Sequence, residues 1–441
     1  MRSVRIGAGA GYSGDRIDPA VELAEKGRLD YLIFECLAER TIALAQKARL
    51  LDPQSGYDPL LEERLEAVLG LCARNGVRII SNMGAANPVA AARKAREVAQ
   101  RLGIRNLRVA AVTGDEVLAL VHAGLACSDE SLRAIPPDRL VSANAYLGAD
   151  AILPALEAGA DVILTGRVAD ASMFVAAMVH SFGWPIDAWE RLGQATVVGH
   201  LLECAGQITG GYFADPPYSA VPGLAHLGFP LAEVMEDGSA VVTKVEGSGG
   251  RITRETCIEQ LLYEVQDPSA YLTPDVIADF SAVQLENAGT DRIRVTGGEG
   301  KARPETLKVS VGFHDGHVGE GQISYAGGGA LARASLARDV LADRLRPQDF
   351  TDLRFDLIGL NAILGPLTRV HGEPSEVRLR VAGRAATSRV AGIIPREVEA
   401  LYTNGPAGGG GVSQSLRETL GIVSTLIHRS QVAPAIHYEE S

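Results

Sequence analysis

The chain of 441 residues carries 42 Lys and Arg against 54 Asp and Glu, a formal net charge of −12, and 46% of its residues are hydrophobic. An acidic surface makes nucleic acid a poor default partner, and so apolar a composition excludes disorder of the whole chain. No apolar run approaches the roughly 18 residues that span a membrane, and the first residues lack the apolar segment of a signal peptide. We therefore expect a cytoplasmic protein with no membrane partner.

Five cysteines are present and none forms a CxxC pair: Cys36, Cys72, Cys127, Cys204 and Cys257. An odd, widely spaced set predicts neither a disulfide framework nor a cysteine zinc site. We expect most of them to be buried as small hydrophobic side chains. Only Cys204 has polar neighbours of chemical interest.

The first 185 or so residues alternate short apolar runs with helical patterns, which is typical of βαβ units. Buried strands are predicted in the segments 4–11, 29–38, 77–84, 105–114 and 160–166. Helices are predicted where apolar residues recur every three or four positions, from Leu61 to Cys72 and from Ala91 to Leu102. Gly76 and Gly103 follow them, and glycine is favoured there because the residue after a helix often takes the left-handed conformation.

Two further helix starts are signalled by proline. Asn87 is the predicted N-cap before Pro88, and Asp18 is the predicted N-cap before Pro19. The alternation predicts an α/β fold, with a mostly parallel, doubly wound sheet in a large N-terminal domain over 1–305.

Residues 190–300 are less periodic and rich in Gly and Pro, and we expect these loops of the large domain to carry site residues. Periodic patterns return in residues 306–441, which we expect to form a smaller α+β domain. Its predicted strands are 307–316, 317–327, 352–360 and 377–383, and its predicted helices are 330–345 and about 391–401.

The first strand leads into a glycine-rich turn. Gly9, Gly11 and Gly14 satisfy GxGxxG, and Glu35 follows the next strand at about the 20-residue spacing that a dinucleotide site requires. Pro19, however, starts the helix after the turn, whereas a dinucleotide site needs the helix N-terminus at the pyrophosphate. The turn is open to three interpretations: a dinucleotide site, an anion or substrate loop, or a tight turn without a ligand.

Polar residues follow other predicted strands, at the edge where open parallel sheets bind ligands. Glu39 is either a general base or a helix-end charge paired with Arg40. Asn87 is accounted for as an N-cap, so Asn82 is the candidate substrate contact in its loop. Asn144 ends a neighbouring strand and is a further candidate.

The segment TGRVADAS places Arg167 and Asp170 at the same expected edge. An arginine there can clamp a carboxylate or a phosphate. The competing interpretation is an ion pair between Arg167 and Asp170 that only fixes the loop.

The segment from Gly199 to Gly211 carries the strongest chemical signal. On a helix, His200, Glu203, Cys204 and Gln207 share one face at spacings of three and four. A histidine beside a partly buried glutamate can move protons near neutral pH. Metal binding is less favoured because only two ordinary ligands are present, and a core histidine bonded to Glu203 is the structural alternative.

Two glycine-rich segments further along carry weaker signals. Lys244 precedes Gly247, Gly249 and Gly250, whose amides can hold an anion or merely form a turn. Asn404 begins NGPAGGGG, a flexible stretch that a phosphate or a neighbouring subunit would order.

The chain contains several long and uncommon segments. They are GxGxGxxGDR at 7–16, FxxLAERT at 34–41, NAYLGAD at 144–150, TGRVADAS at 165–172, GHLLECAGQITGGYFADP at 199–216, YLTPDVIADF at 271–280 and NGPAGGGG at 404–411. Together they resemble the acyclic terpene utilisation family, AtuA, over nearly the whole chain. The resemblance implies bacterial breakdown of acyclic isoprenoid acids such as citronellate and geranylate through coenzyme A thioesters. Carboxylation, hydration and lyase cleavage are steps of that route.

The resemblance also carries over recurring positions, which here are Gly9, Gly11, Asp15, Glu39, Arg40, Asn144, Arg167, Asp170, His200, Glu203, Gln207, Asp275 and Asn404. The chain departs from the pattern where Glu35 and Cys36 replace an aspartate and an aromatic residue before LAERT. It departs again where SNMGAANP replaces a threonine-initiated loop. Both departures can alter substrate choice.

We therefore expect an enzyme with lyase or hydratase chemistry on a carboxylate or an acyl-CoA, working as a homo-oligomer. The sequence assigns no residue to a metal and leaves the need for one open. His200 and Glu203 are the predicted acid/base pair, and Arg167 binds the substrate with Asp170 orienting it. The remaining predicted substrate contacts are Gly9, Gly11, Glu39, Asn82, Asn144, Gln207, Lys244 and Asn404. The alternatives are an NAD-dependent oxidoreductase with Glu35 on the ribose, and a non-catalytic assembly subunit.

Overall fold

The computed structural model describes residues 2–126, 130–368 and 372–439. The chain divides into two compact units: unit 1 is Met1–Gly312 with Ile422–Ser441, and unit 2 is Phe313–Gly421. The predicted boundary after residue 305 differs from this division because two long strands, β14 (Thr306–Ala326) and β17 (Gly410–His428), each contribute residues to both units. The last residues of the chain thereby return to unit 1.

Unit 1 is built on a ten-stranded sheet with a parallel centre. The parallel strands are, in spatial order, β1 (Ser3–Ala10), β2 (Tyr31–Phe34), β3 (Arg78–Ser81), β6 (Val162–Thr165) and β4 (Val109–Thr113). Antiparallel strands flank them: β7 (Pro230–Met235), β8 (Ala240–Lys244), β12 (Arg292–Thr296) and β11 (Gln284–Gly289) beyond β1, and β18 (Ala435–Glu439) beyond β4. The α/β class is confirmed, but the sheet as a whole is mixed; its doubly wound topology stays a prediction.

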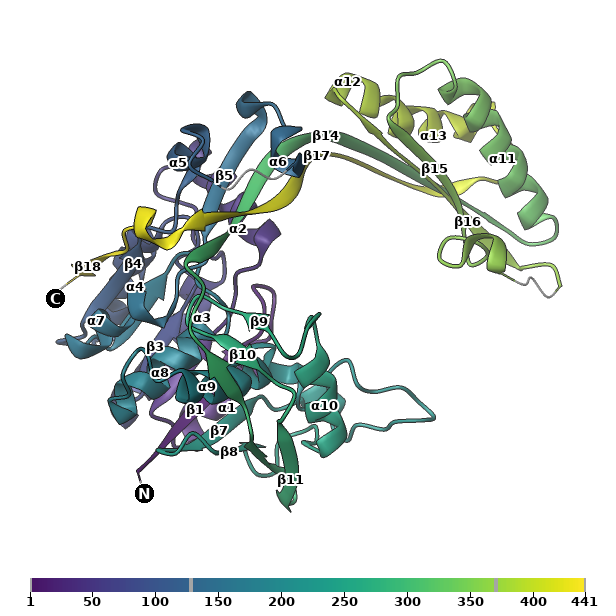
Figure 1. The fold of residues 1–441 in the computed structure, drawn as a ribbon. Helices are drawn as coiled ribbons and strands as arrows, with labels where there is room; N and C mark the ends of the chain where they lie inside the picture. The colour runs from purple at the N-terminus through teal and green to yellow at the C-terminus, as the bar shows by residue number, and fades with distance from the viewer. Residues whose placement is uncertain (1, 127–129, 369–371, 440–441) are drawn as a thin grey trace. The chain divides into compact units, whose positions relative to one another are not determined.

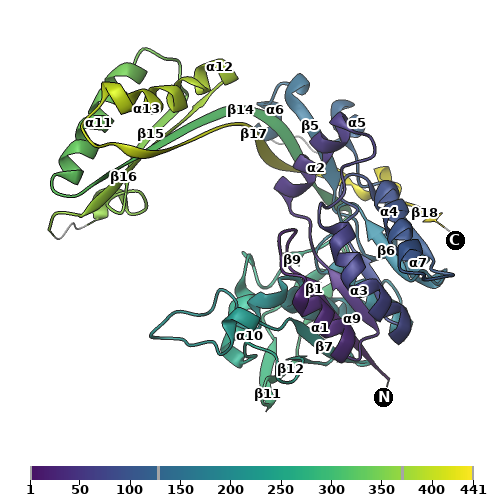
Figure 2. The same cartoon turned by 180° about the vertical axis from the view of Figure 1, so that it is seen from behind.

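Two groups of helices pack on this sheet. Figure 2 shows α1 (Asp18–Lys26), α3 (Leu61–Asn75) and α4 (Pro88–Arg101) side by side, and Figure 1 shows α8 (Ser172–Phe182) against α9 (Trp189–Glu203). The other helices of unit 1 are α2 (Glu39–Leu51), α5 (Leu118–His122), α6 (Glu130–Arg133), α7 (Leu153–Glu157) and α10 (Arg254–Leu262). None of the described helices has the length and apolar character needed to cross a membrane.

Unit 1 contains two smaller sets of strands. β13 (Glu299–Lys301), β10 (Ile277–Asp279) and β9 (Tyr271–Leu272) form a three-stranded sheet, while β5 (Leu140–Ala145) pairs with β14. One large core fills the space between the main sheet and its helices. Cys36, Cys72 and Cys257 are buried free thiols and Cys204 is partly exposed, whereas Cys127 lies outside the described residues.

The helix ends largely follow the sequence signals. Gly76 closes α3 at φ 69°, and Gly103 follows α4 with φ 70°. The side chain of Asn87 accepts a hydrogen bond from the Ala90 amide, so it is the N-cap of α4 as predicted. Asp18, in contrast, is the first residue of α1 and not its N-cap, and its carboxylate pairs with Arg16.

Unit 2 has its own core. Its sheet runs β15 (Asp352–Ile358), β16 (Glu376–Ala385), β14 and β17, and its helices are α11 (Ala330–Leu345), α12 (Ser388–Ala391) and α13 (Ile393–Asn404). Alternate residues of β16 are buried against α11 and α13. The two strands predicted over 307–327 are one continuous strand, β14.

Candidate active site

Polar residues meet at one edge of the main sheet. Glu35 follows β2, Asn82 follows β3, Arg167 follows β6 and Asp115 follows β4. Because these strands are parallel neighbours, their carboxyl ends lie along the same edge. Open α/β sheets bind ligands at this edge.

Arg167 is the central cation of this edge and is only 1% exposed. Its Nη2 donates to Oδ1 of Asp170 at 2.5 Å, and its guanidinium lies 4.0 Å from the ring centre of Tyr146. Its Nε and Nη1 have no hydrogen-bond partner among the described residues. Because a buried donor without a partner costs about 1–3 kcal/mol, an anionic ligand oxygen there would be stabilising.

Asp115 holds the backbone of Arg167. Its Oδ2 accepts from the Arg167 amide at 2.9 Å and from Nδ2 of Asn144 at 2.8 Å. Burial raises the pKa of Asp115 to about 6. A Cβ on Gly166 would lie 2.3 Å from Oδ1 of Asp115, so glycine is needed there. Asn144, a predicted substrate contact, therefore supports Asp115.

Glu35 and Asn82 form a second buried pair. Oε1 of Glu35 accepts from Nδ2 of Asn82 at 3.0 Å and from the Leu37 amide at 2.9 Å. Oδ1 of Asn82 accepts in turn from the Cys36 amide. Burial and then the charge of Asp170 raise the pKa of Glu35 to about 8, although Arg167 opposes them. The predicted contact Asn82 thus reaches the site through Glu35.

Asp170 acts electrostatically both on Glu35 and on Glu203 at the end of α9. Its side chain is 39% exposed, so water reaches it, yet the surrounding protein raises its pKa. After burial, its charge is among the causes that raise the pKa values of Glu35, Glu203, Cys204 and Tyr271. Asp170 is therefore within electrostatic reach of the end of α9.

His200 and Glu203 form a hydrogen-bonded pair on α9, with 2.7 Å between Nδ1 and Oε1. The imidazole is buried and packs on the rings of Tyr271 and Phe280. Burial alone would lower the pKa of His200, but the charge and hydrogen bond of Glu203 raise it, and burial raises the pKa of Glu203. The pair therefore holds a proton more firmly than either group alone.

Two atoms of this pair lack hydrogen-bond partners among the described residues: Nε2 of His200 and Oε2 of Glu203. The backbone carbonyls of Gln260 and Leu261 approach His200 closely enough to raise its pKa, but not with the geometry of a hydrogen bond to Nε2. A purely structural histidine would have both ring nitrogens satisfied. Both unpaired atoms are enclosed by protein, and the acid/base role of the pair stays a prediction.

The predicted helical face stops short of Gln207. Helix α9 ends at Glu203, and the 3-10 turn η3 (Ala205–Gln207) follows with Ala205 at φ 41°. A non-glycine residue with positive φ breaks the helical register. Gln207 therefore does not continue the face of His200 and Glu203, which corrects the predicted alignment.

Glu39 belongs to the support of Arg167. Its Oε1 accepts from the Tyr146 hydroxyl at 2.6 Å and from Nζ of Lys308 at 3.0 Å. Burial opposes ionisation, but these donors prevail and lower the pKa of Glu39 to about 2. A carboxylate of such low basicity is a poor general base at neutral pH. Glu39 instead fixes the ring on which Arg167 stacks.

The glycine-rich turn is filled by protein. A Cβ on Gly9 would lie 2.6 Å from the Phe34 ring, and one on Gly11 would lie 2.5 Å from the Cys204 backbone. The Gly11 amide donates to Asp15, whose carboxylate takes the place an anion would need. These contacts account for Gly9 and Gly11 by packing, and a substrate or dinucleotide contact at either residue stays a prediction.

Lys244 ends β8, which runs in the same direction as β1, so it lies at this edge of the sheet but beyond β1. Nζ of Lys244 donates to the Ser248 carbonyl at 2.7 Å and pairs with Asp291 at 3.3 Å. The amides of Gly249 and Gly250 donate to backbone carbonyls, so the predicted anion cradle is closed. Asn404 belongs to unit 2, where its side chain donates to its own helix and to Thr403.

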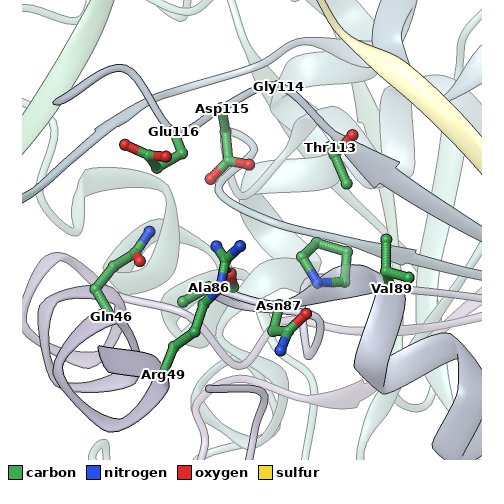
Figure 3. Close-up of a pocket in the computed structure, with 10 residues that line it drawn as sticks. Gln46, Arg49, Ala86, Asn87, Val89, Thr113, Gly114, Asp115 and Glu116 are labelled. Carbon is green, nitrogen blue, oxygen red and sulfur yellow. Dashed lines mark hydrogen bonds between the residues drawn. The ribbon is translucent and has the colours of Figure 1, made fainter. Parts of the chain in front are cut away.

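A cavity of about 280 Å³ lies beside Asp115 (Figure 3). Its walls come from α2, from the start of α4 and from the segment after β4; they are Gln46, Arg49, Ala86, Asn87, Pro88, Val89, Thr113, Gly114, Asp115 and Glu116. Arg49 donates to the Ala86 carbonyl at one wall, and Asp115 and Glu116 place carboxylates at another. None of the predicted catalytic residues lines this cavity.

Sequence reasoning missed Asp115 and Tyr146 as members of the site. Asp115 stands just beyond a buried strand, and that position is a usable signal for a ligand-edge residue. Tyr146 lies in the NAYLGAD segment, but its contacts with Glu39 and Arg167 join residues distant in sequence. Glu35 was expected as a ribose contact or as a departure that alters substrate choice, and not as a buried partner of Asn82.

Within 2–126, 130–368 and 372–439, no group of three or more His, Cys, Asp and Glu side chains is placed to hold a metal ion. A family model described as acyclic terpene utilisation family protein AtuA matches residues 4–438. No curated protein and no solved structure matches the chain.

Proposed function

The chain belongs to the acyclic terpene utilisation family AtuA, and from that premise we propose that it is an enzyme that moves protons on a carboxylic acid or acyl thioester. Membership of the family gives a role in acyclic terpene utilisation. Lyase or hydratase chemistry and the acyl substrate are our proposal, for which the geometry of the β-strand edge supplies the support.

The observation that carries the proposal is the state of Arg167. A buried guanidinium with Nε and Nη1 unpaired favours an oxygen of a carboxylate or of a polarised carbonyl. Removing a proton next to such a carbonyl places negative charge on its oxygen. A fixed cation in a site of low dielectric stabilises that charge more in the transition state than in the ground state.

We assign the proton transfer to the His200–Glu203 pair at the end of α9. Nε2 of His200 and Oε2 of Glu203 have no hydrogen-bond partner among the described residues, which leaves each of them able to bond a ligand group that reaches it. Burial raises the pKa of Glu203, and the charge and hydrogen bond of Glu203 raise the pKa of His200, so both groups hold a proton more firmly than they would in water. Asp170 orients Arg167 through its ion pair.

The first experiment is a thermal-shift scan of the purified chain against branched and linear acyl-CoA esters, free terpenoid acids and NAD(P), with and without EDTA. A ligand at a hundredfold excess over its Kd stabilises the folded state by about 2.7 kcal/mol. A shift with an acid or a CoA ester supports the proposal. A shift of the melting temperature with NAD(P) alone favours the oxidoreductase. If no ligand shifts the melting temperature, a non-catalytic assembly subunit is favoured.

A further inference from the structure

Glu35 is a buried carboxyl group that the acid/base pair on α9 does not use. It is 8% exposed and stands at the carboxyl end of β2, in the same row as Arg167. Its two oxygens have different surroundings. Oε1 accepts two hydrogen bonds, from Nδ2 of Asn82 and from the Leu37 amide.

The two donors determine where a proton can sit. An oxygen that already accepts two N–H bonds has no free lone pair for a proton, so the proton of a neutral Glu35 must be on Oε2. Oε2 accepts no hydrogen bond from the described residues and is not among the fully enclosed unpaired atoms. Asn82 keeps its orientation because its own Oδ1 accepts from the Cys36 amide.

The charged and titratable groups that act on Glu35 are Asp170 and Arg167, and Glu35 in turn acts on Cys36 and Cys204. The Asp170 carboxylate and the burial of the site favour the neutral form of Glu35, while Arg167 opposes it. The two thiols are neutral near pH 7, because burial raises their pKa values. The balance leaves a carboxylic acid beside an ion pair.

We propose that Glu35 is a second catalytic residue of this site, a general acid that carries a transferable proton on Oε2. The inference rests on the proposed function and deepens it, because it assigns the general base and the general acid to different groups. In the elimination of water from a β-hydroxyacyl substrate, the His200–Glu203 pair takes the proton from the α-carbon, and the C–H electron pair forms the double bond. The C–O bond breaks, and the departing hydroxyl takes the Oε2 proton and leaves as water. Solvent then returns a proton to Glu35 and takes one from the pair.

Infrared spectroscopy of the full chain tests the protonation state without any substrate. Glu35→Gln retains an oxygen that accepts the same two N–H bonds and an amide in place of the hydroxyl, so the fold should be kept. At pH 7 the wild type is expected to show the C=O stretch of a neutral carboxyl, which disappears in Glu35→Gln and weakens above pH 8. Glu39→Gln is the matched control, because Glu39 is ionised at pH 7 and its removal should leave that band unchanged.

An unchanged neutral-carboxyl band in Glu35→Gln would overturn the inference. With the substrate found by the thermal-shift scan, Glu35→Gln should still bind but lose at least about a hundredfold in elimination rate, the usual contribution of a general acid. Elimination at the wild-type rate would also overturn it. Failure of the proposed function is distinguishable, because it would appear as the absence of any acyl-ligand shift in the wild type.

Discussion

At the scale of single residues, the candidate site is organised by one buried cation. Arg167 is held at its backbone by Asp115, at its side chain by Asp170 and over its face by Tyr146, yet keeps two donors unpaired. A buried charge is tolerated only when its surroundings compensate it. The three supports fix the guanidinium in place and leave the remaining donors for a ligand.

Arg167→Lys should weaken ligand binding while the chain still folds. Lysine keeps the positive charge but replaces the planar fork with a point charge, so the geometry shared between Asp170 and a ligand oxygen is lost. We expect acyl-ligand affinity to fall about tenfold to a hundredfold, the effect of losing a charge-assisted hydrogen bond. Isothermal titration with the best ligand of the thermal-shift scan measures it.

Arg49→Lys is the control for that measurement, because Arg49 lines the cavity of Figure 3 and has no contact with Asp170. Equal affinity losses in the two variants would contradict a specific role for Arg167.

The buried acid at Glu35 also predicts how stability depends on pH. Its pKa is about 8 in the folded chain against an ordinary 4.5, so between these values the folded state holds a proton that the unfolded state has released. Unfolding free energy therefore falls as pH rises through this window, by up to about 1.4 kcal/mol per pH unit. Glu35→Gln lacks this slope.

Denaturant titrations at pH 5, 6.5 and 8 test the prediction. The stability of Glu35→Gln relative to the wild type should increase steadily from pH 5 to pH 8. A difference that is the same at all three pH values would show that Glu35 is ionised in the folded chain.

At the scale of elements, the glycine-rich turn lets the residues after β1 pack closely against the end of α9. A Cβ on Gly11 would meet the backbone of Cys204, just beyond the His200–Glu203 pair. The GxGxxG pattern is shared by anion-binding turns and by turns that need a close backbone approach. Sequence alone cannot separate the two, because the atoms that fill the space come from residues distant in the chain.

Gly11→Ala should destabilise the chain. The added Cβ would lie 2.5 Å from the carbonyl carbon of Cys204, and backbone cannot yield as a flexible side chain can. We expect a loss of about 1–3 kcal/mol of unfolding free energy, as for other overpacked sites. Chemical denaturation measures this loss.

Gly70→Ala is the matched control within α3. Its Cβ would find only the flexible end of Arg74 at 3.7 Å, so the substitution should stabilise the chain by about 0.5–1 kcal/mol through helix propensity. Gly11→Ala variants as stable as the wild type would refute the packing role of the turn.

Sequence reasoning succeeded with elements whose signals are local. Periodicity and end signals located α3, α4 and α11, and spacings of three predicted the contacts of His200 with Glu203 and Arg167 with Asp170. It failed where partners are distant. The hydrogen bond of Asn82 to Glu35 and the hydrogen bond of Lys308 to Glu39 depend on strand order, which no local pattern encodes.

At the scale of the whole molecule, the residues assigned to the site come from unit 1. Every residue assigned to the edge of the main sheet lies within Met1–Gly312. The sequence predicted two parts with a boundary after residue 305, whereas the compact units divide within β14, after Gly312. It also missed β17 and β18, which return the chain to unit 1.

Unit 2 should therefore be replaceable. Strands β14 and β17 are hydrogen-bonded neighbours, and a Cβ on Gly421 would touch the Phe313 ring, so the ends of unit 2 are close together. A chain in which an Asn-Gly turn replaces residues 313–421 should form a hairpin at this point. We expect it to melt cooperatively and keep the ligand shift of the full chain; loss of the shift in a folded variant would mean that unit 2 supplies part of the site.

The most direct test of the central claim is hydrogen exchange at the carbon next to the acyl carbonyl. The full chain is incubated in D2O with the acid or CoA ester that gives the largest thermal shift, and deuterium uptake is followed by NMR. If Arg167 stabilises the developing charge while the His200–Glu203 pair moves the proton, the wild type incorporates deuterium and Glu203→Gln is slower by at least about a hundredfold. Binding without exchange in the wild type, or equal exchange in Glu203→Gln, would contradict the assignment of this edge of the sheet as a proton-transfer site.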